Sequence, residues 1–99
     1  MVLSRPAIDL FAAAVLFLQE QNDWHRSAKI FVQLRDALVK RAPPGTTPDA
    51  LFWPAMRGEV MALHRLNRGA DATALLEAFI GIYPDAPDDL LKQIESHNV

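Results

Sequence analysis

Apolar residues recur at three- and four-residue spacing along most of this chain, which is the spacing of one face of an α-helix. No stretch shows the strict alternation of apolar and polar residues that a half-buried strand requires. Most of the prolines gather at 43–48 and 84–87, where they separate helices. The pattern predicts one all-helical domain over 1–99, with two stacked antiparallel helical hairpins at about 6–42 and 47–84 and a short C-terminal helix at about 86–97.

Short polar residues mark the ends of the two helices in the first hairpin. The first helix is predicted from residue 6 or 7 to residue 21, with Ser4 as its N-cap. Asn22 or Asp23 can cap the second helix, because either side chain accepts a hydrogen bond from a free N–H group of the first turn. The segment 42–45, Ala-Pro-Pro-Gly, ends the second helix, since proline lacks the N–H group that would continue it.

Pro54 complicates the start of the third helix. Thr47, Pro48 and Asp49 have the order of an N-cap, a first-turn proline and an acidic second residue. Pro54 then falls inside the helix, where a proline removes a hydrogen bond and clashes with the preceding turn. We expect the helix to kink at Pro54; the alternative is a short turn over 48–52 before the helix proper.

A tight turn at 67–69, Asn-Arg-Gly, joins the third helix to the fourth, and Gly69 can adopt a positive φ there. The fourth helix is predicted from about residue 70 to Ile82, and Tyr83 with Pro84 ends it. Five apolar residues at helical spacing are expected to face inward: Ala72, Leu75, Leu76, Phe79 and Ile82.

The two hairpins repeat each other at an offset of 45 residues, which aligns residue 22 with residue 67. Ser27 then aligns with Ala72, and both are small residues that let two helices approach closely. The turn at 66–72, the pair of leucines at 75–76 and the closing Tyr-Pro-Asp at 83–85 resemble the tetratricopeptide repeat. Glu59 departs from that family's pattern, which prefers an apolar residue there.

The resemblance covers most of 7–87 and implies a stack of antiparallel helical hairpins. In size, helix layout and turn residues the chain is also similar to the small tetratricopeptide-type chaperones of bacterial type III secretion, which hold needle or early export subunits in the cytoplasm. This second resemblance implies a cytoplasmic chaperone that holds an amphipathic helix of a secretion subunit. The alternative is a helical-repeat interaction module of another pathway.

Composition and charge exclude several other classes of protein. The net charge of −2 provides no field that would draw the chain to nucleic acid or anionic lipid. The absence of cysteine excludes disulfides and thiolate chemistry, and it favours a reducing compartment such as the cytoplasm. The apolar run from Leu10 to Leu18 is too short to span a bilayer, so we expect no membrane insertion.

No cluster of residues suits catalysis or cofactor binding. The three histidines, His25, His64 and His97, do not have the spacing of metal ligands. Helix capping explains the acidic residues at 85, 88 and 89. No serine lies in a nucleophile elbow, and no glycine-rich loop could hold a phosphate. We therefore expect no enzymatic activity, no metal and no cofactor.

The first helix carries more apolar residues than one buried face can hold, because those at 10–18 surround the whole helix. If this helix lies at the end of the stack, the surplus forms a surface for an apolar helix of another polypeptide or for a second copy of the chain. The alternative is that the C-terminal helix folds back and covers it. Self-association through the first helix would make the chain a structural oligomerisation domain. The partner groove predicted between the first and third helices is lined by Leu10, Ala14, Phe17, Phe52, Trp53, Met56 and Leu63, with Arg57 and Arg65 orienting the partner.

Overall fold

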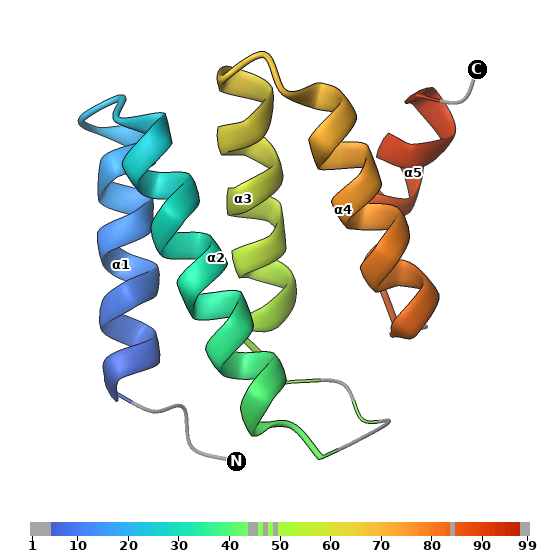
Figure 1. Cartoon of the computed structure of the whole chain (residues 1–99), viewed down its shortest axis with the longest axis horizontal. Helices are drawn as coiled ribbons and strands as arrows, with labels where there is room; N and C mark the ends of the chain where they lie inside the picture. Colours follow the sequence, from blue (N-terminus) through green and yellow to red (C-terminus); the bar gives the residue numbers. More distant parts are fainter. Residues whose placement is uncertain (1–4, 44–45, 47, 49, 84, 98–99) are drawn as a thin grey trace.

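The computed structural model describes residues 5–43, 46, 48, 50–83 and 85–97, with the backbone alone at 95–97. This part of the chain forms helices and no strand, which confirms the all-helical prediction. The helices are α1 (Arg5–Gln19), α2 (Trp24–Arg41), α3 (Phe52–Arg65), α4 (Gly69–Ile82) and α5 (Asp88–His97) (Figure 1).

The helices stack as two hairpins followed by the C-terminal helix. Each helix packs against the next one along the chain, and α1 also contacts α3. Because α2 contacts both α1 and α3, the successive helices alternate between two layers, and the Cα atoms fill a slab of 39 × 35 × 17 Å. Figure 1 shows α1 and α5 at opposite ends of this slab. The alternative in which the C-terminal helix covers the first helix is therefore wrong, because α5 packs on α4 instead.

The turns inside the two hairpins each contain an asparagine with a positive φ. Asn22 has a φ of 52° and Asn67 a φ of 60°, in the left-handed region that asparagine tolerates better than most residues. The two asparagines are the residues that the 45-residue offset aligns. The positive φ that Gly69 could have adopted is not needed, because Asn67 makes the turn and Gly69 already begins α4.

The prediction of a kink at Pro54 is wrong, and the alternative of a turn before the helix proper is correct. The helix begins at Phe52, and the amide of Ala55 donates to the carbonyl of Leu51 at 2.9 Å. Pro54 therefore lies in the first turn, where backbone N–H groups have no acceptor within the helix and a missing N–H group removes nothing. The predicted cap residues Thr47 and Asp49 lie outside the described residues.

Polar contacts fix how α1 meets α2. Asp23 caps α2, as predicted for Asn22 or Asp23, by accepting a hydrogen bond from the amide of Arg26 at 3.1 Å. One turn into α2, the buried hydroxyl of Ser27 donates to the carbonyl of Ala14 in α1 at 2.7 Å. The small side chain of Ser27 lets the two helices approach closely, and its buried hydroxyl has a hydrogen-bond acceptor in the carbonyl of Ala14.

Replacing Ser27 by alanine should lower the free energy of unfolding by about 1 kcal/mol, since one buried hydrogen bond between helices is lost and the volume hardly changes. Thr73→Ala is a suitable control, because among the described residues the Thr73 hydroxyl bonds only to the carbonyl of Gly69 in its own helix, at 3.1 Å. Urea denaturation of both variants measures the difference. Equal stability of the two variants would show that the Ser27 contact does not stabilise the hairpin.

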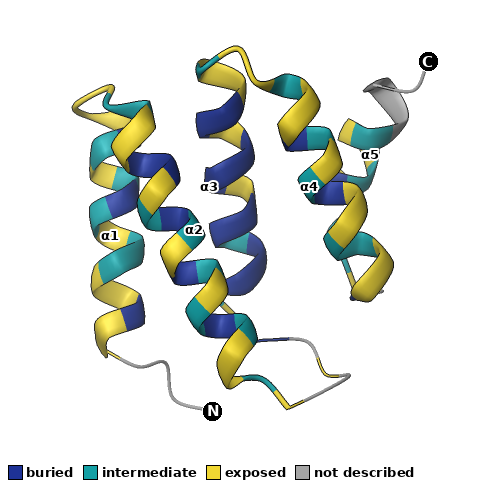
Figure 2. Ribbon diagram, in the orientation of Figure 1, coloured by how far each residue is buried: buried dark blue, intermediate teal, exposed yellow. Residues whose placement is uncertain are grey.

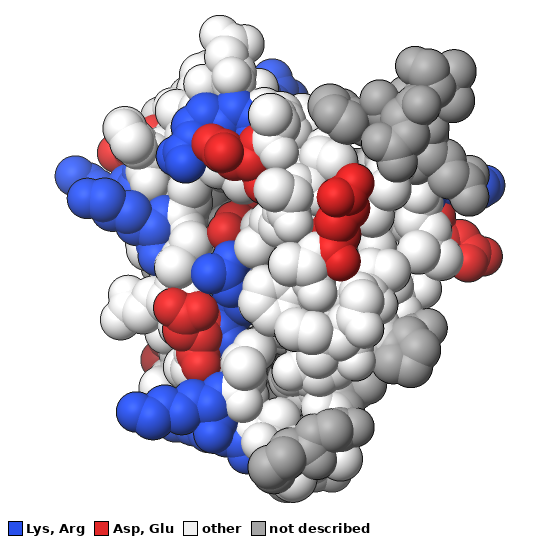
Figure 3. All heavy atoms as spheres, turned by 45° about the vertical axis from the view of Figure 1, so that its right-hand side comes forward, with Lys and Arg blue, Asp and Glu red and all other residues white. Residues whose placement is uncertain are grey.

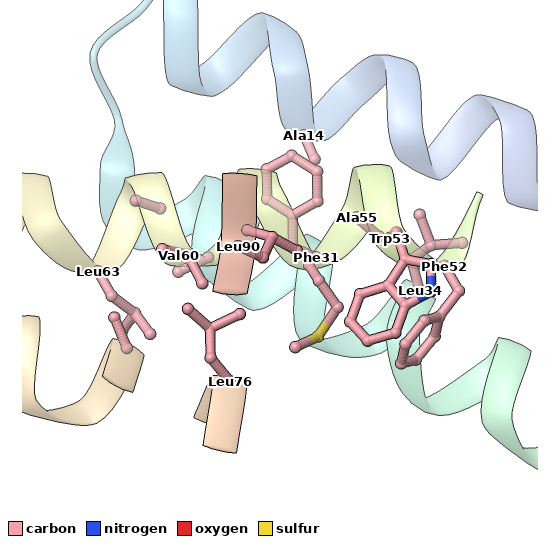
Figure 4. Close-up of a cluster of buried hydrophobic side chains, with 14 of the residues drawn as sticks. Ala14, Phe31, Leu34, Phe52, Trp53, Ala55, Val60, Leu63, Leu76 and Leu90 are labelled. Carbon is pink, nitrogen blue, oxygen red and sulfur yellow. The ribbon is translucent and has the colours of Figure 1, made fainter. Parts of the chain in front are cut away.

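The core is centred on α3, which Figure 2 shows as the most buried helix. Its neighbours contribute one or more large side chains each, and Figure 4 shows labelled members of the cluster coming from all five helices. The ring of Phe31 in α2 packs directly on Gly58 of α3, where a Cβ atom would overlap that ring. Phe11 of α1 meets the same ring edge to face, with 6.1 Å between centroids.

The inward face predicted for the fourth helix is correct except at its end. Ala72 and Leu76 are buried, and Leu75 and Phe79 are partly buried against the core. Ile82 is 60% exposed, so its placement inside was wrong. It lies on the same side of the helix as the partly buried Leu75, seven residues earlier, but it is the last residue of α4.

Candidate functional site

Most apolar residues of the predicted partner groove lie in the core. The buried ones come from α1 and α3, and they are Ala14, Phe52, Trp53, Met56 and Leu63. Leu10 and Phe17 are partly exposed, and the guanidinium of Arg26 lies 5.0 Å from the centroid of the Phe17 ring. Contact between a partner and Ala14, Phe52, Trp53 or Met56 would require the core to open, so of the buried five the site described below uses only Leu63, which lines its floor.

The two arginines predicted to orient a partner lie on the exposed face of α3. Arg57 holds α5, because its Nε and Nη2 donate to the Asp89 carboxylate at 2.8 and 2.9 Å. The hydrogen bond from Arg57 lowers the pKa of Asp89, and the charge of Arg57 lowers it further. Arg65 is exposed and lines a hollow of about 250 Å³ together with Arg57 and Met61.

A groove of about 470 Å³ lies between α2, α3 and α4, and we call it the α2–α4 groove. Its floor is Ala28, Leu63 and the ion pair of Arg35 with Glu59, while the partly exposed Val32 and Leu75 form its walls. Its rim is polar and exposed, with His25 and Lys29 on α2 facing Arg68 and Asp71 at the start of α4. Figure 3 shows a hollow with charged side chains along its left edge and mostly uncharged atoms to its right.

The ion pair on the floor of the α2–α4 groove joins α2 to α3. Nη1 of Arg35 lies 2.6 and 2.7 Å from the two carboxylate oxygens of Glu59, and the two side chains are only 13% and 6% exposed. The guanidinium also lies 5.3 Å from the centroid of the Phe79 ring in α4, within cation–π range. Burial raises the pKa of Glu59, and the charge and hydrogen bonds of Arg35 oppose part of that rise.

The charges of the α2–α4 groove leave one cation without an internal partner. Arg35 is neutralised by Glu59, and Nε of Arg68 lies 2.7 Å from a carboxylate oxygen of Asp71. Lys29 forms no ion pair with any residue that the structure describes. The rim is thus locally positive on a chain whose net charge is −2, which favours an anionic group in the occupant.

Sequence reasoning did not find the Arg35–Glu59 pair, although one half of it left a signal. Glu59 stands among the apolar residues of the α3 stripe, and a carboxylate at such a position needs a charged partner when it is buried. The partner lies 24 residues upstream on another helix, and nothing in the local pattern distinguishes Arg35 from the other cations of α2. The groove above the pair was missed for the same reason.

Comparisons with sequence profiles of known protein families, with curated proteins and with solved structures found no match. The function is therefore argued from the surface of this chain alone. Over the described residues, no three acidic or histidine side chains gather as metal ligands would. Over the same residues, none of the helices combines the length and apolar character of a membrane span.

Proposed function

We propose that this chain is a protein–protein interaction module whose α2–α4 groove receives an amphipathic segment of another polypeptide. The observation that carries the proposal is the composition of the groove: apolar residues on the floor and walls, around the neutralised Arg35–Glu59 pair, within a polar, charged rim. Protein interfaces have the same distribution of residues, with an apolar centre and a polar rim that stays in contact with water. The narrower prediction, a chaperone for a type III secretion subunit, rests on resemblance alone and stays a prediction.

The openness of the α2–α4 groove favours a polypeptide over a small molecule. Small-molecule sites enclose most of the ligand surface, whereas this groove lies along the outer layer of the slab with its rim in solvent. An amphipathic helix can bury one face in such a groove and leave the other face in water. Val32 and Leu75, on opposite walls, would contact apolar side chains one turn apart on that helix.

The charge of Lys29 at the rim indicates that the partner carries an acidic group. Lys29 would meet a carboxylate beside the apolar face of the bound segment, and Arg35 below it is already neutralised. Such a rim contact changes the rate of association and the orientation more than it changes the affinity. The expected partner is therefore an acidic amphipathic segment, with most of its affinity from apolar contact.

The test uses peptides selected by the protein from a displayed library of random helical sequences. Val32→Glu should weaken binding of the selected peptides at least about 10-fold, because it puts a charged carboxylate on an apolar wall. Ile82→Glu is the matched control, since Ile82 is exposed on the same layer but does not line the groove. Fluorescence anisotropy measures both. Failure to select any peptide, or equal affinity for the Val32→Glu variant and the unchanged protein, would overturn the proposal.

A further inference from the structure

An apolar stripe runs along the solvent side of α1, at the end of the stack. Ile8 and Leu16 are 42% and 41% exposed, and Ala12 between them is also exposed. Their four-residue spacing puts all three on one face of the helix. The terminal helices of helical-repeat stacks ordinarily carry a polar outer face, because nothing further covers them. On α1 the outer face instead exposes Ile8, Ala12 and Leu16, with Asp9 as the one charged residue beside them.

We infer that a second copy of this chain covers the stripe, with the two α1 helices antiparallel and a two-fold axis through Ala12. A two-fold interface must be complementary to itself, so that each residue meets its counterpart across the axis. The stripe has this property, because large side chains stand four residues on either side of a small one. Ile8 of each copy then meets Leu16 of the other, and the paired Ala12 residues let the helices approach closely.

The charges at the two ends of α1 favour the antiparallel arrangement. It places residue 5 opposite residue 19 of the other copy, so that Arg5, near the start of the helix, lies close to Glu20, just beyond the helix end. Arg5 is exposed and contacts Asp9 of its own helix at 3.2 Å, while Glu20 forms no ion pair with any described residue. A parallel pair would instead put Arg5 beside Arg5. Opposite charges therefore meet at both ends of the antiparallel pair and at neither end of the parallel one.

The short length of α1 limits the affinity of one copy for the other. Fifteen residues form a helix of about 22 Å, which offers less than the roughly 800 Å² per partner of a standard stable interface. The dimer is therefore weak and forms with rising concentration. It leaves the α2–α4 groove free, since none of the residues lining that groove belongs to α1. The dimer proposal and the groove proposal can therefore be tested independently of each other.

A single thiol on the two-fold axis tests the arrangement directly, because the chain has no cysteine. Ala12→Cys should form a disulfide-linked dimer under mild oxidation, since the two Cβ atoms at the crossing face each other. Ala78→Cys, at an exposed alanine of α4, is the control and should cross-link only at the rate of random collision. Equal rates for the two variants would overturn the two-fold axis through Ala12.

Charge exchange tests the register on the otherwise unchanged protein. Sedimentation of the unchanged protein should show a dimer that grows with concentration, while Arg5→Glu and Glu20→Arg should each raise the dimer dissociation constant about 5-fold or more. Mixing the two variants restores opposite charges at both ends, so the mixture should dimerise as well as the unchanged protein. Circular dichroism confirms that each variant is folded. A monomer at every concentration, binding of α1 to anionic vesicles in place of a dimer, or a mixture no better than its components would each contradict the proposal.

Discussion

Replacing Gly58 by alanine should destabilise the protein by about 3 kcal/mol, one of the two largest effects expected of a single substitution. The added Cβ would overlap the ring of Phe31, which is only 1% exposed. That ring cannot retreat, because Phe11 packs against it from the side of α1. The substitution therefore forces α2 and α3 apart along the contact that joins the two hairpins.

Gly81→Ala is the matched control for this prediction. Gly81 is also a helical glycine, yet a Cβ atom there would have no neighbour within 4 Å. This substitution should stabilise the protein by about 0.5–1 kcal/mol, the ordinary gain when alanine replaces glycine inside a helix. The double variant Gly58→Ala/Phe31→Leu should recover part of the loss, because the shorter side chain makes room. Urea denaturation that finds Gly58→Ala as stable as the unchanged protein would refute the close approach.

Replacing Glu59 by alanine should lower the free energy of unfolding by about 3–5 kcal/mol, because it leaves the buried charge of Arg35 without a partner. Replacing both residues with apolar side chains, as Arg35→Met/Glu59→Leu, should cost much less than the single change. Nε of Arg35 is already buried without a hydrogen-bond partner among the described residues. Loss of the Glu59 contact would therefore leave the guanidinium with still fewer hydrogen bonds. The single variants Arg35→Met and Glu59→Leu complete the comparison, and additive effects of these two substitutions in the double variant would mean that the pair does not act as a unit.

The pH dependence of stability follows from the raised pKa of Glu59. The folded chain holds the Glu59 proton more tightly than the unfolded chain does, so the contribution of Glu59 to stability is fully present below the unfolded pKa. That contribution is lost as the pH rises from the ordinary carboxyl range through the raised folded value. Glu59→Gln should remove this decline. Denaturation at a series of pH values checks it, and identical profiles for the two proteins would contradict it.

Much of the fold could be predicted from the sequence, because helical periodicity is a local signal. The prolines that separate the hairpins and the aligned turns at Asn22 and Asn67 sufficed to define two hairpins and a C-terminal helix. Pro54 shows the limit of local reasoning. A proline fits the first turn of a helix as well as a kink, and only the position of Leu51 against the core decides between them.

The candidate site could be predicted much less well. Periodicity shows that Phe52 and Met56 belong to an apolar stripe, but it does not show whether another helix covers that stripe. The central helix α3 is covered on several sides, so Phe52 and Met56 are buried in the core. The surplus on the first helix was a better guide, since Ile8 and Leu16 do reach the surface. The α2–α4 groove depends on contacts between distant segments and has no signature within any one helix.

The central claim is that the α2–α4 groove binds a polypeptide, and amide chemical shifts test it most directly. Isotope-labelled protein is titrated with a peptide selected as described above, and the shifted amides are mapped on the structure. We predict that the shifts gather at Ala28, Val32, Leu63 and Leu75, with little change along α1 or α5. Shifts gathered on the exposed stripe of α1, or along the face that α3 shares with α5, would contradict the claim.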